Sequence, residues 1–182
     1  MEVLDLFPRS ILRGTLPAPL LNQLIDLGES VLANPSASPD ASAKLAGQLR
    51  QQRELRPDQP AVQQLSAEVL LPACDRWIRH VMDRQPPQGR GPWVPGRYRL
   101  QMIDLWINCQ TAGDYNPTHT HGGSFSGVIF LKVPPQINGN SFDGQLCFHG
   151  PEDWHLQSFR TGMAHYVPVS YTHLTLPTRD LV

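Results

Sequence analysis

Apolar residues in the first half of the chain recur at intervals of three and four, as they do along one face of an amphipathic helix. This spacing predicts a helix over residues 18–34 and a longer one over residues 61–84. Pro72 should kink or divide the longer helix, because proline lacks a backbone N–H and its ring clashes with the preceding turn. Residues 43–56 form a more polar helix candidate, and residues 1–16 an extended, strand-like lead.

The pattern changes after a linker rich in proline and glycine, residues 85–96. Short apolar or alternating runs bounded by turn residues follow, and such runs are typical of strands. The predicted strands are residues 97–108, 118–121, 124–133, 145–149 and 163–169. Helices followed by strands indicate an α+β fold with an antiparallel sheet or barrel. We expect one domain, in which a mainly helical region, residues 1–96, packs on a core formed by residues 97–169.

Charge and composition narrow the classes of function. Fifteen basic and sixteen acidic residues leave a net charge of -1, so nothing in the bulk charge attracts nucleic acid or an anionic membrane. A small molecule or a protein is therefore the expected substrate. Three cysteines without C-x-x-C spacing indicate neither a disulfide framework nor a cysteine zinc site. With no signal peptide and no membrane-spanning run in the sequence, we expect a protein of the reducing cytoplasm.

The candidate chemistry lies in the stretch WINCQTAGDYNPTHTHGGSFSGVIFLKVPP, residues 106–135. It contains a closely spaced histidine pair, His119 and His121. Residues two apart in a strand share a face, so both imidazoles could reach one metal ion while Thr118 and Thr120 lie on the other side. The alternative is a pair of solvated or hydrogen-bonded histidines, since His-x-His also occurs in strands that bind nothing.

This stretch resembles the core of a family of 2-oxoglutarate- and Fe(II)-dependent oxygenases, and the resemblance covers about residues 97–169. It implies a double-stranded β-helix, or jelly roll, of the cupin-like kind, with iron at the mouth of the barrel. It also implies Fe(II) as cofactor, 2-oxoglutarate as co-substrate and a hydroxylase-type reaction. Such enzymes hold iron with two histidines and a carboxylate, which leaves positions open for co-substrate and dioxygen.

By this resemblance His119 is the first iron ligand, and His121 stands where an acidic residue is more common. The site could then be all-histidine, could take a carboxylate from elsewhere such as Asp143, or could leave His121 outside the metal shell. Three polar residues near the pair are candidates for contact with a ligand ring or with 2-oxoglutarate: Asn108, Asn116 and Ser126. Turn formation before a proline equally explains Asn116, and burial in a sheet equally explains Ser126.

The resemblance ends after Val169. The family's last histidine ligand and its arginine for 2-oxoglutarate follow a turn that is missing here, so residues 170–182 are interpreted as a non-native tail on a truncated core. Loss of those two residues could leave the chain inactive as written, and the open sheet edges would favour self-association. His173 and Arg179 are not assigned to the missing roles. The possible compensating ligands are His149, His155 and His165, each of which also has a purely structural explanation.

Two other classes remain open. The Thr-His-Thr-His run is similar to the opening of the H-x-H-x-D-H zinc motif of metallo-β-lactamases, although Gly123 and Ser124 stand at the last two motif positions. A zinc metallohydrolase is therefore one alternative. The other is a cupin-like binding module that keeps the fold without the chemistry.

Overall fold

A computed structural model of the chain describes residues 1–6, 9–42, 47, 49, 51–84, 99–119, 121, 124–141, 143–151 and 161–166. These residues form an α+β fold, as the order of patterns predicted. The chain divides into two compact units. One comprises residues 1–16, 73–94 and 122–182, and the other comprises residues 17–72 and 95–121. The predicted boundaries at residues 96 and 169 stay predictions.

The second unit begins with the helix α1, Ala18–Ala33, which confirms the helix predicted from apolar spacing. The Pro17 carbonyl accepts the first helical hydrogen bond from the Leu21 N–H at 3.0 Å. A short 3-10 turn, η1, follows at Pro35–Ala37. The buried face of α1 consists of Leu20, Leu24, Gly28 and Val31. This stripe packs against the helix α2, Pro60–Leu65, and each buried leucine or valine stabilises the unit by about 1.5–3 kcal/mol.

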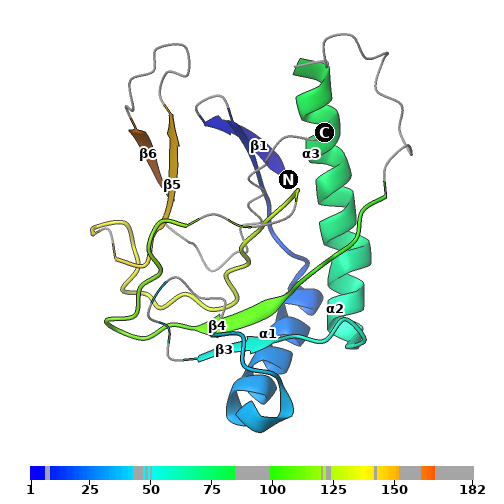
Figure 1. Ribbon diagram of the computed structural model, residues 1–182, viewed down its shortest axis with the longest axis vertical. Helices are drawn as coiled ribbons and strands as arrows, with labels where there is room; N and C mark the ends of the chain where they lie inside the picture. The colour runs from blue at the N-terminus through cyan, green and yellow to red at the C-terminus, as the bar shows by residue number, and fades with distance from the viewer. Residues whose placement is uncertain are drawn as a thin grey trace. The chain divides into compact units, whose positions relative to one another are not determined.

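The predicted long helix over residues 61–84 is present, with an irregular turn inside it. The helix α2 continues into a π-helical turn, η3, Ser66–Leu70, and then into α3, Leu71–Arg84 (Figure 1). The Leu71 N–H donates to the Ser66 carbonyl, five residues back. The next bond in that register would need an N–H on residue 72, which proline lacks. Pro72 therefore marks the irregularity, as predicted, in the form of a π turn.

A two-stranded sheet completes this unit. Its strands β3, Gln51–Glu54, and β4, Trp106–Cys109, are antiparallel (Figure 1). Backbone hydrogen bonds from the Ala41 N–H to the Gln52 carbonyl and from the Glu54 N–H to the Pro39 carbonyl join residues 39–41 to β3. Within this arrangement Gln52 is 2% exposed, and its Nε2 donates to the Ala41 carbonyl at 3.0 Å.

The helix predicted over residues 43–56 is therefore wrong for its C-terminal part, which is β3. Residues 43–46, 48 and 50 lie outside the described part. Local polarity indicated a solvated helix, but hydrogen bonds to β4 and to residues 39–41 are what define this segment. The strand β4 is more than 50 residues away in the sequence, and residues 39–41 are not in a regular element. Apolar spacing within residues 43–56 therefore gives no sign of either partner.

The strand predictions between residues 97 and 133 are also largely wrong. Of the predicted strand 97–108, residues 106–108 belong to β4, residues 99–105 are not in a strand, and residues 97–98 lie outside the described part. No strand is present in the described residues of 118–121 or in 124–133. Alternation describes which side chains are apolar, whereas a strand also requires a neighbouring backbone that takes its hydrogen bonds. Between the predicted strands 124–133 and 145–149, the described residues form turns, bends and irregular structure.

The first unit contains two hairpin-like pairs. The strands β1, Glu2–Leu6, and β2, Arg9–Arg13, are antiparallel and resolve the predicted extended lead into two strands. The strands β5, Leu146–Pro151, and β6, Thr161–Tyr166, pair in register from Leu146 opposite Tyr166. They confirm the strands predicted at residues 145–149 and, as far as Tyr166, at 163–169. The strands described here thus form three two-stranded antiparallel sheets.

The core of the first unit centres on Trp77 of α3, which is 2% exposed. Its indole N–H donates to the Ser10 carbonyl at 2.9 Å, and its ring meets Phe125 edge-on with centroids 5.7 Å apart. Ile11 and Leu12 of β2 are buried as well. Among the described helices, none combines the length and apolar character that crossing a membrane requires.

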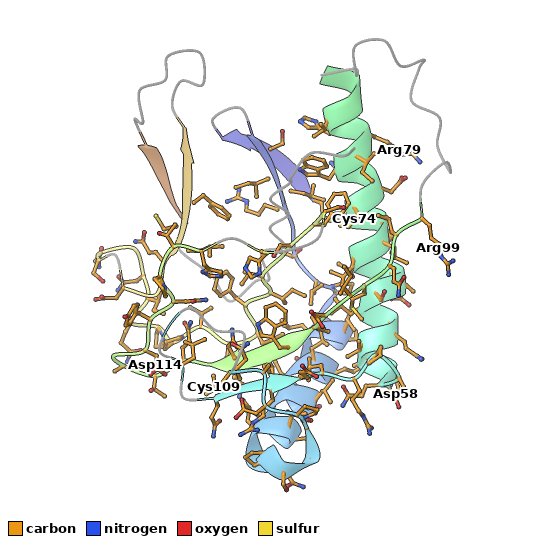
Figure 2. All side chains as sticks on the ribbon, in the orientation of Figure 1. Asp58, Cys74, Arg79, Arg99, Cys109 and Asp114 are labelled. Atoms are coloured by element: carbon orange, nitrogen blue, oxygen red, sulfur yellow. The ribbon has the colours of Figure 1, made fainter. Side chains whose placement is uncertain are left out.

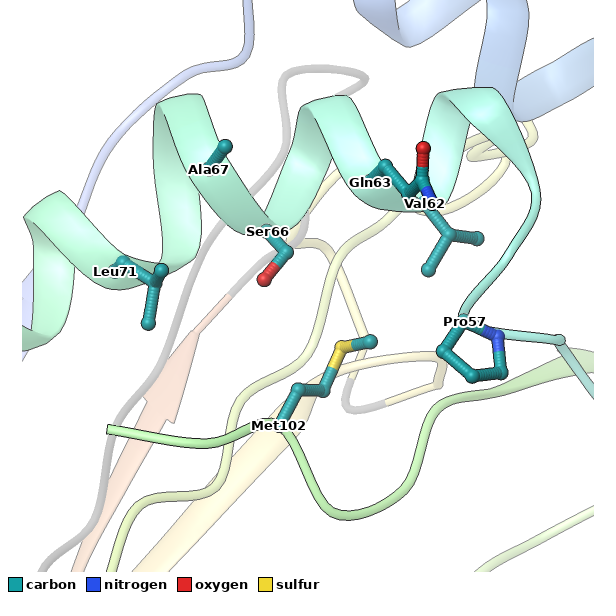
Figure 3. Close-up of a pocket in the computed structure, with 7 residues that line it drawn as sticks. All are labelled: Pro57, Val62, Gln63, Ser66, Ala67, Leu71 and Met102. Carbon is teal, nitrogen blue, oxygen red and sulfur yellow. The ribbon is translucent and has the colours of Figure 1, made fainter. Parts of the chain in front are cut away.

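The second unit also has a groove of about 300 Å³ along the π turn. Figure 3 shows the Met102 side chain reaching toward the helix face that carries Val62 and Ser66. The remaining lining residues are Pro57, Gln63, Ala67 and Leu71. No charged side chain and none of the predicted site residues lines this groove.

Candidate metal centre

The histidine pair follows β4 in the chain after a tight turn. The Asp114 N–H donates to the Thr111 carbonyl at 3.0 Å, and the Asp114 carboxylate accepts from the Thr111 N–H at 2.8 Å (Asp114 is labelled in Figure 2). Gly113 has φ +88°, a left-handed conformation that glycine adopts without strain. The Gly-Asp pair of the sequence stretch therefore serves to form the turn between the strand and the histidines.

The two imidazoles lie side by side although their segment is not a strand. Their Nε2 atoms are 3.0 Å apart, and the ring centroids are 4.7 Å apart. The strand predicted over residues 118–121 is therefore wrong for the residues described. The two imidazoles nevertheless lie close together, as that strand predicted. The loop conformation, rather than strand alternation, brings the rings together.

The backbone assigns a tautomer to His119. Its Nδ1 lies 2.7 Å from the Pro117 carbonyl oxygen. A carbonyl can only accept, so Nδ1 carries the hydrogen and donates. In a neutral imidazole the other nitrogen, Nε2, then has a free lone pair, and this lone pair is directed at His121. Metal-bound histidines commonly have this arrangement, in which a backbone carbonyl holds the nitrogen that does not bind.

The spacing of the two nitrogens suits a metal with octahedral geometry. With metal–nitrogen bonds of 2.0–2.1 Å, ligands at right angles are separated by about 2.9 Å and ligands at the tetrahedral angle by about 3.3 Å. The observed 3.0 Å is nearer to the first value. The same separation also fits an N–H···N hydrogen bond, in which the Nε2–H of His121 donates to His119 while no metal is bound. Two imidazole nitrogens are a donor set that Fe(II) accepts.

An aromatic ring from β4 borders the pair. Trp106 stacks on His121, with ring centroids 6.1 Å apart and planes 25° from parallel. Burial, followed by the charge of His119, lowers the pKa of His121 below its usual value. The neutral form, which is the form that can bind a metal, is thereby favoured.

The other predicted residues are distributed between the two units. Asn108 lies on β4 two residues from Trp106, so both side chains are on the same face of the strand, and Asn108 is exposed. Asn116 is exposed immediately before Pro117. Ser126 belongs to the first unit and is half-buried in a segment without regular structure, not in a sheet. Among the described residues, no hydrogen bond joins any of these three to the histidines, and their roles stay predictions.

A third ligand does not accompany the pair in the described part of the chain, where no group of three or more His, Cys, Asp or Glu could hold a metal ion. Asp143 belongs to the first unit, and its carboxylate accepts from the Ser141 hydroxyl at 2.9 Å. His149 and His165 are backbone members of β5 and β6. His155, His173 and Arg179 lie outside the described residues.

Two contacts of the pair are not predicted by the sequence pattern. The Trp106 ring contacts His121, and the Pro117 carbonyl accepts from His119. Trp106 is thirteen and fifteen residues before the two histidines, so spacing along the chain carries no signal of its contact. Pro117 is only two residues before His119, but that spacing does not indicate that its carbonyl accepts from the ring.

Comparison with known proteins supports one family. Residues 104–176 match the family model described as "Putative 2OG-Fe(II) oxygenase", which spans less than half of the chain. This match confirms the resemblance predicted from the stretch around the histidine pair. The family implies Fe(II) as cofactor and 2-oxoglutarate as co-substrate. Searches of curated proteins and of solved structures found no match.

Proposed function

From the match of residues 104–176 to the 2OG-Fe(II) oxygenase family, we propose that the chain is a hydroxylase-type oxygenase that uses Fe(II) and 2-oxoglutarate, with His119 and His121 as iron ligands. The observation that carries the assignment of ligands is the 3.0 Å separation of the two Nε2 atoms within the matched region. The jelly-roll barrel that the family implies for residues 97–169 is part of the same proposal.

When bound, Fe(II) with 2-oxoglutarate and dioxygen would supply the oxidising power to hydroxylate a C–H bond. The residues of the chain prepare the site. The Pro117 carbonyl keeps the His119 hydrogen on Nδ1, which leaves Nε2 to bind. Partial burial, and the charge of His119 whenever that residue is protonated, lower the pKa of His121 and so favour its neutral form. Asn108 and Asn116, which lie in the same unit as the histidines, remain candidates for contact with the co-substrate.

The experiment that tests this function measures succinate formed from 2-oxoglutarate in the presence of Fe(II) and oxygen. Decarboxylation of the co-substrate that is not coupled to hydroxylation would still form succinate, so the assay is run without an added substrate. We expect His119→Ala and His121→Ala each to reduce succinate formation by about 100-fold or more, since even residues that only support a ligand affect activity by about 10–100-fold. His80→Ala, a histidine of α3, is the matched control and should keep full activity.

Equal succinate formation by the wild type and both alanine variants would contradict the assignment of the ligands. Hydrolytic activity that requires Zn(II) and neither iron nor 2-oxoglutarate would contradict the oxygenase itself and favour the metallohydrolase class.

A further inference from the structure

The histidine pair is supported by two residues that do not belong to it, and the first is Trp106. This residue lies on β4 opposite Glu54 of β3, so the sheet determines where its indole lies. The indole is half-buried and stacks on His121 at 25° from parallel. His121 is otherwise exposed, so contact with the indole on one face favours some orientations of its ring, and with them some directions of its Nε2, over others.

The second support is Gly47, which lies against the segment that holds His119. A methyl group built on Gly47 would collide with the Tyr115 carbonyl oxygen, and would lie 2.7 Å from Asn116 Cα and 2.8 Å from Pro117 Cδ. Two of these three atoms belong to the backbone, which cannot rotate away as a side chain can. Only a residue without Cβ allows this close approach. Any larger residue forces the two segments apart, so residues 115–117, which include the carbonyl that accepts from His119, lose their present contact with residue 47.

We propose that Gly47 and Trp106 are positioning residues that hold the two imidazoles in one tautomer and one orientation before metal binds. Gly47 acts on His119 through the Pro117 carbonyl, and Trp106 acts on His121 through ring stacking. This inference deepens the proposed function, because it assigns the residues that prepare the same pair for a metal ion. The two supports come from segments 59 residues apart in the chain, and neither residue touches the nitrogens that would bind.

The primary test needs no metal. Nitrogen NMR of the histidine side chains, recorded on the full chain at pH 8, distinguishes a nitrogen that carries hydrogen from one that does not. We expect wild-type His119 to be protonated at Nδ1 alone. In Gly47→Ala its two nitrogens should give averaged signals, because the Pro117 carbonyl has moved. In Trp106→Leu the same averaging should occur at His121, and Trp106→Phe, which keeps an aromatic ring, should restore the wild-type signals.

Two controls separate positioning from general destabilisation. Trp77→Phe removes an indole from the core of the first unit, and Gly14→Ala adds a methyl group that meets mainly the side chain of Met1, which can rotate aside. Both should leave the histidine signals unchanged, whatever they do to the melting temperature. Wild-type tautomers in both Gly47→Ala and Trp106→Leu would overturn the proposal.

Co(II) affinity, followed by the visible absorption of the bound ion, is the second readout. We expect Gly47→Ala and Trp106→Leu to weaken Co(II) binding by about 10–100-fold, the range found when the support of a ligand is lost. If the wild type does not bind Co(II) at the histidine pair, the proposed function fails while the NMR result still decides the positioning roles. If the wild type binds and both variants bind equally well, the positioning proposal alone fails.

Discussion

At the scale of single residues, the close approach of His119 and His121 has a consequence for stability. The pKa of His121 is lowered by burial and by the charge of His119. In the unfolded chain this group returns to a pKa near 6.5. The unfolded state therefore binds more protons once the pH falls below about 6.5, and acid destabilises the metal-free fold through this group.

We therefore expect the free energy of unfolding of the metal-free protein to fall as the pH is lowered from 7.5 through 6.5 to 5. The decrease should be smaller in His121→Gln, which has no proton to take up. Urea unfolding at a series of pH values measures both slopes. His80→Gln, at a histidine outside the pair, should keep the wild-type slope. A wild-type slope in His121→Gln would show that this side chain does not contribute.

At the scale of elements, Trp77 is the residue through which α3 packs in the core of the first unit. Its indole is 2% exposed, donates to the carbonyl of Ser10 in β2 and meets Phe125. We expect Trp77→Ala to lower the free energy of unfolding by about 3–5 kcal/mol, the usual cost of truncating a buried aromatic side chain. Trp77→Phe should lose less, because it keeps an aromatic ring in the core and gives up only part of the buried volume together with the N–H donor.

Chemical denaturation monitored by circular dichroism gives these values. Ile103→Ala is the matched control, since Ile103 is 76% exposed and its truncation should change stability by no more than about 0.5 kcal/mol. If Trp77→Ala costs as little as Ile103→Ala, the described packing around α3 is not the core of its unit.

At the scale of the whole molecule, a metal that binds the folded chain must stabilise it. A ligand present at 100 times its dissociation constant adds about 2.7 kcal/mol to the free energy of unfolding. We expect Co(II), added without oxygen, to raise the melting temperature of the wild type, and a chelator to reverse the increase. The variant in which both His119 and His121 are alanine should show no increase. An equal increase in that variant would indicate that the metal binds elsewhere.

The sequence could predict an element when the residues that stabilise it are neighbours in the chain. The helix α1 and the run from α2 to α3 were predictable because the spacing of their apolar residues is visible within each segment, and Pro72 predicted an irregularity in the longer helix. The strand β3 was not, because Gln51–Glu54 is polar throughout and becomes a strand only through bonds to β4 and to residues 39–41. The apolar run 124–133 was mistaken for a strand for the opposite reason, since hydrophobicity does not supply a pairing partner.

The candidate site divides in the same way. The residue types at positions 119 and 121, their separation by one residue and the motif around them belong to the sequence alone, and they were enough to indicate the oxygenase family that residues 104–176 match. Three features were decided only in the tertiary structure. They are the conformation that brings the two Nε2 atoms to 3.0 Å, the carbonyl that selects the tautomer of His119, and the contacts of Trp106 and Gly47. The physical reason is that ligand chemistry is a property of a side chain, whereas orientation depends on neighbours that the chain brings together from distant positions.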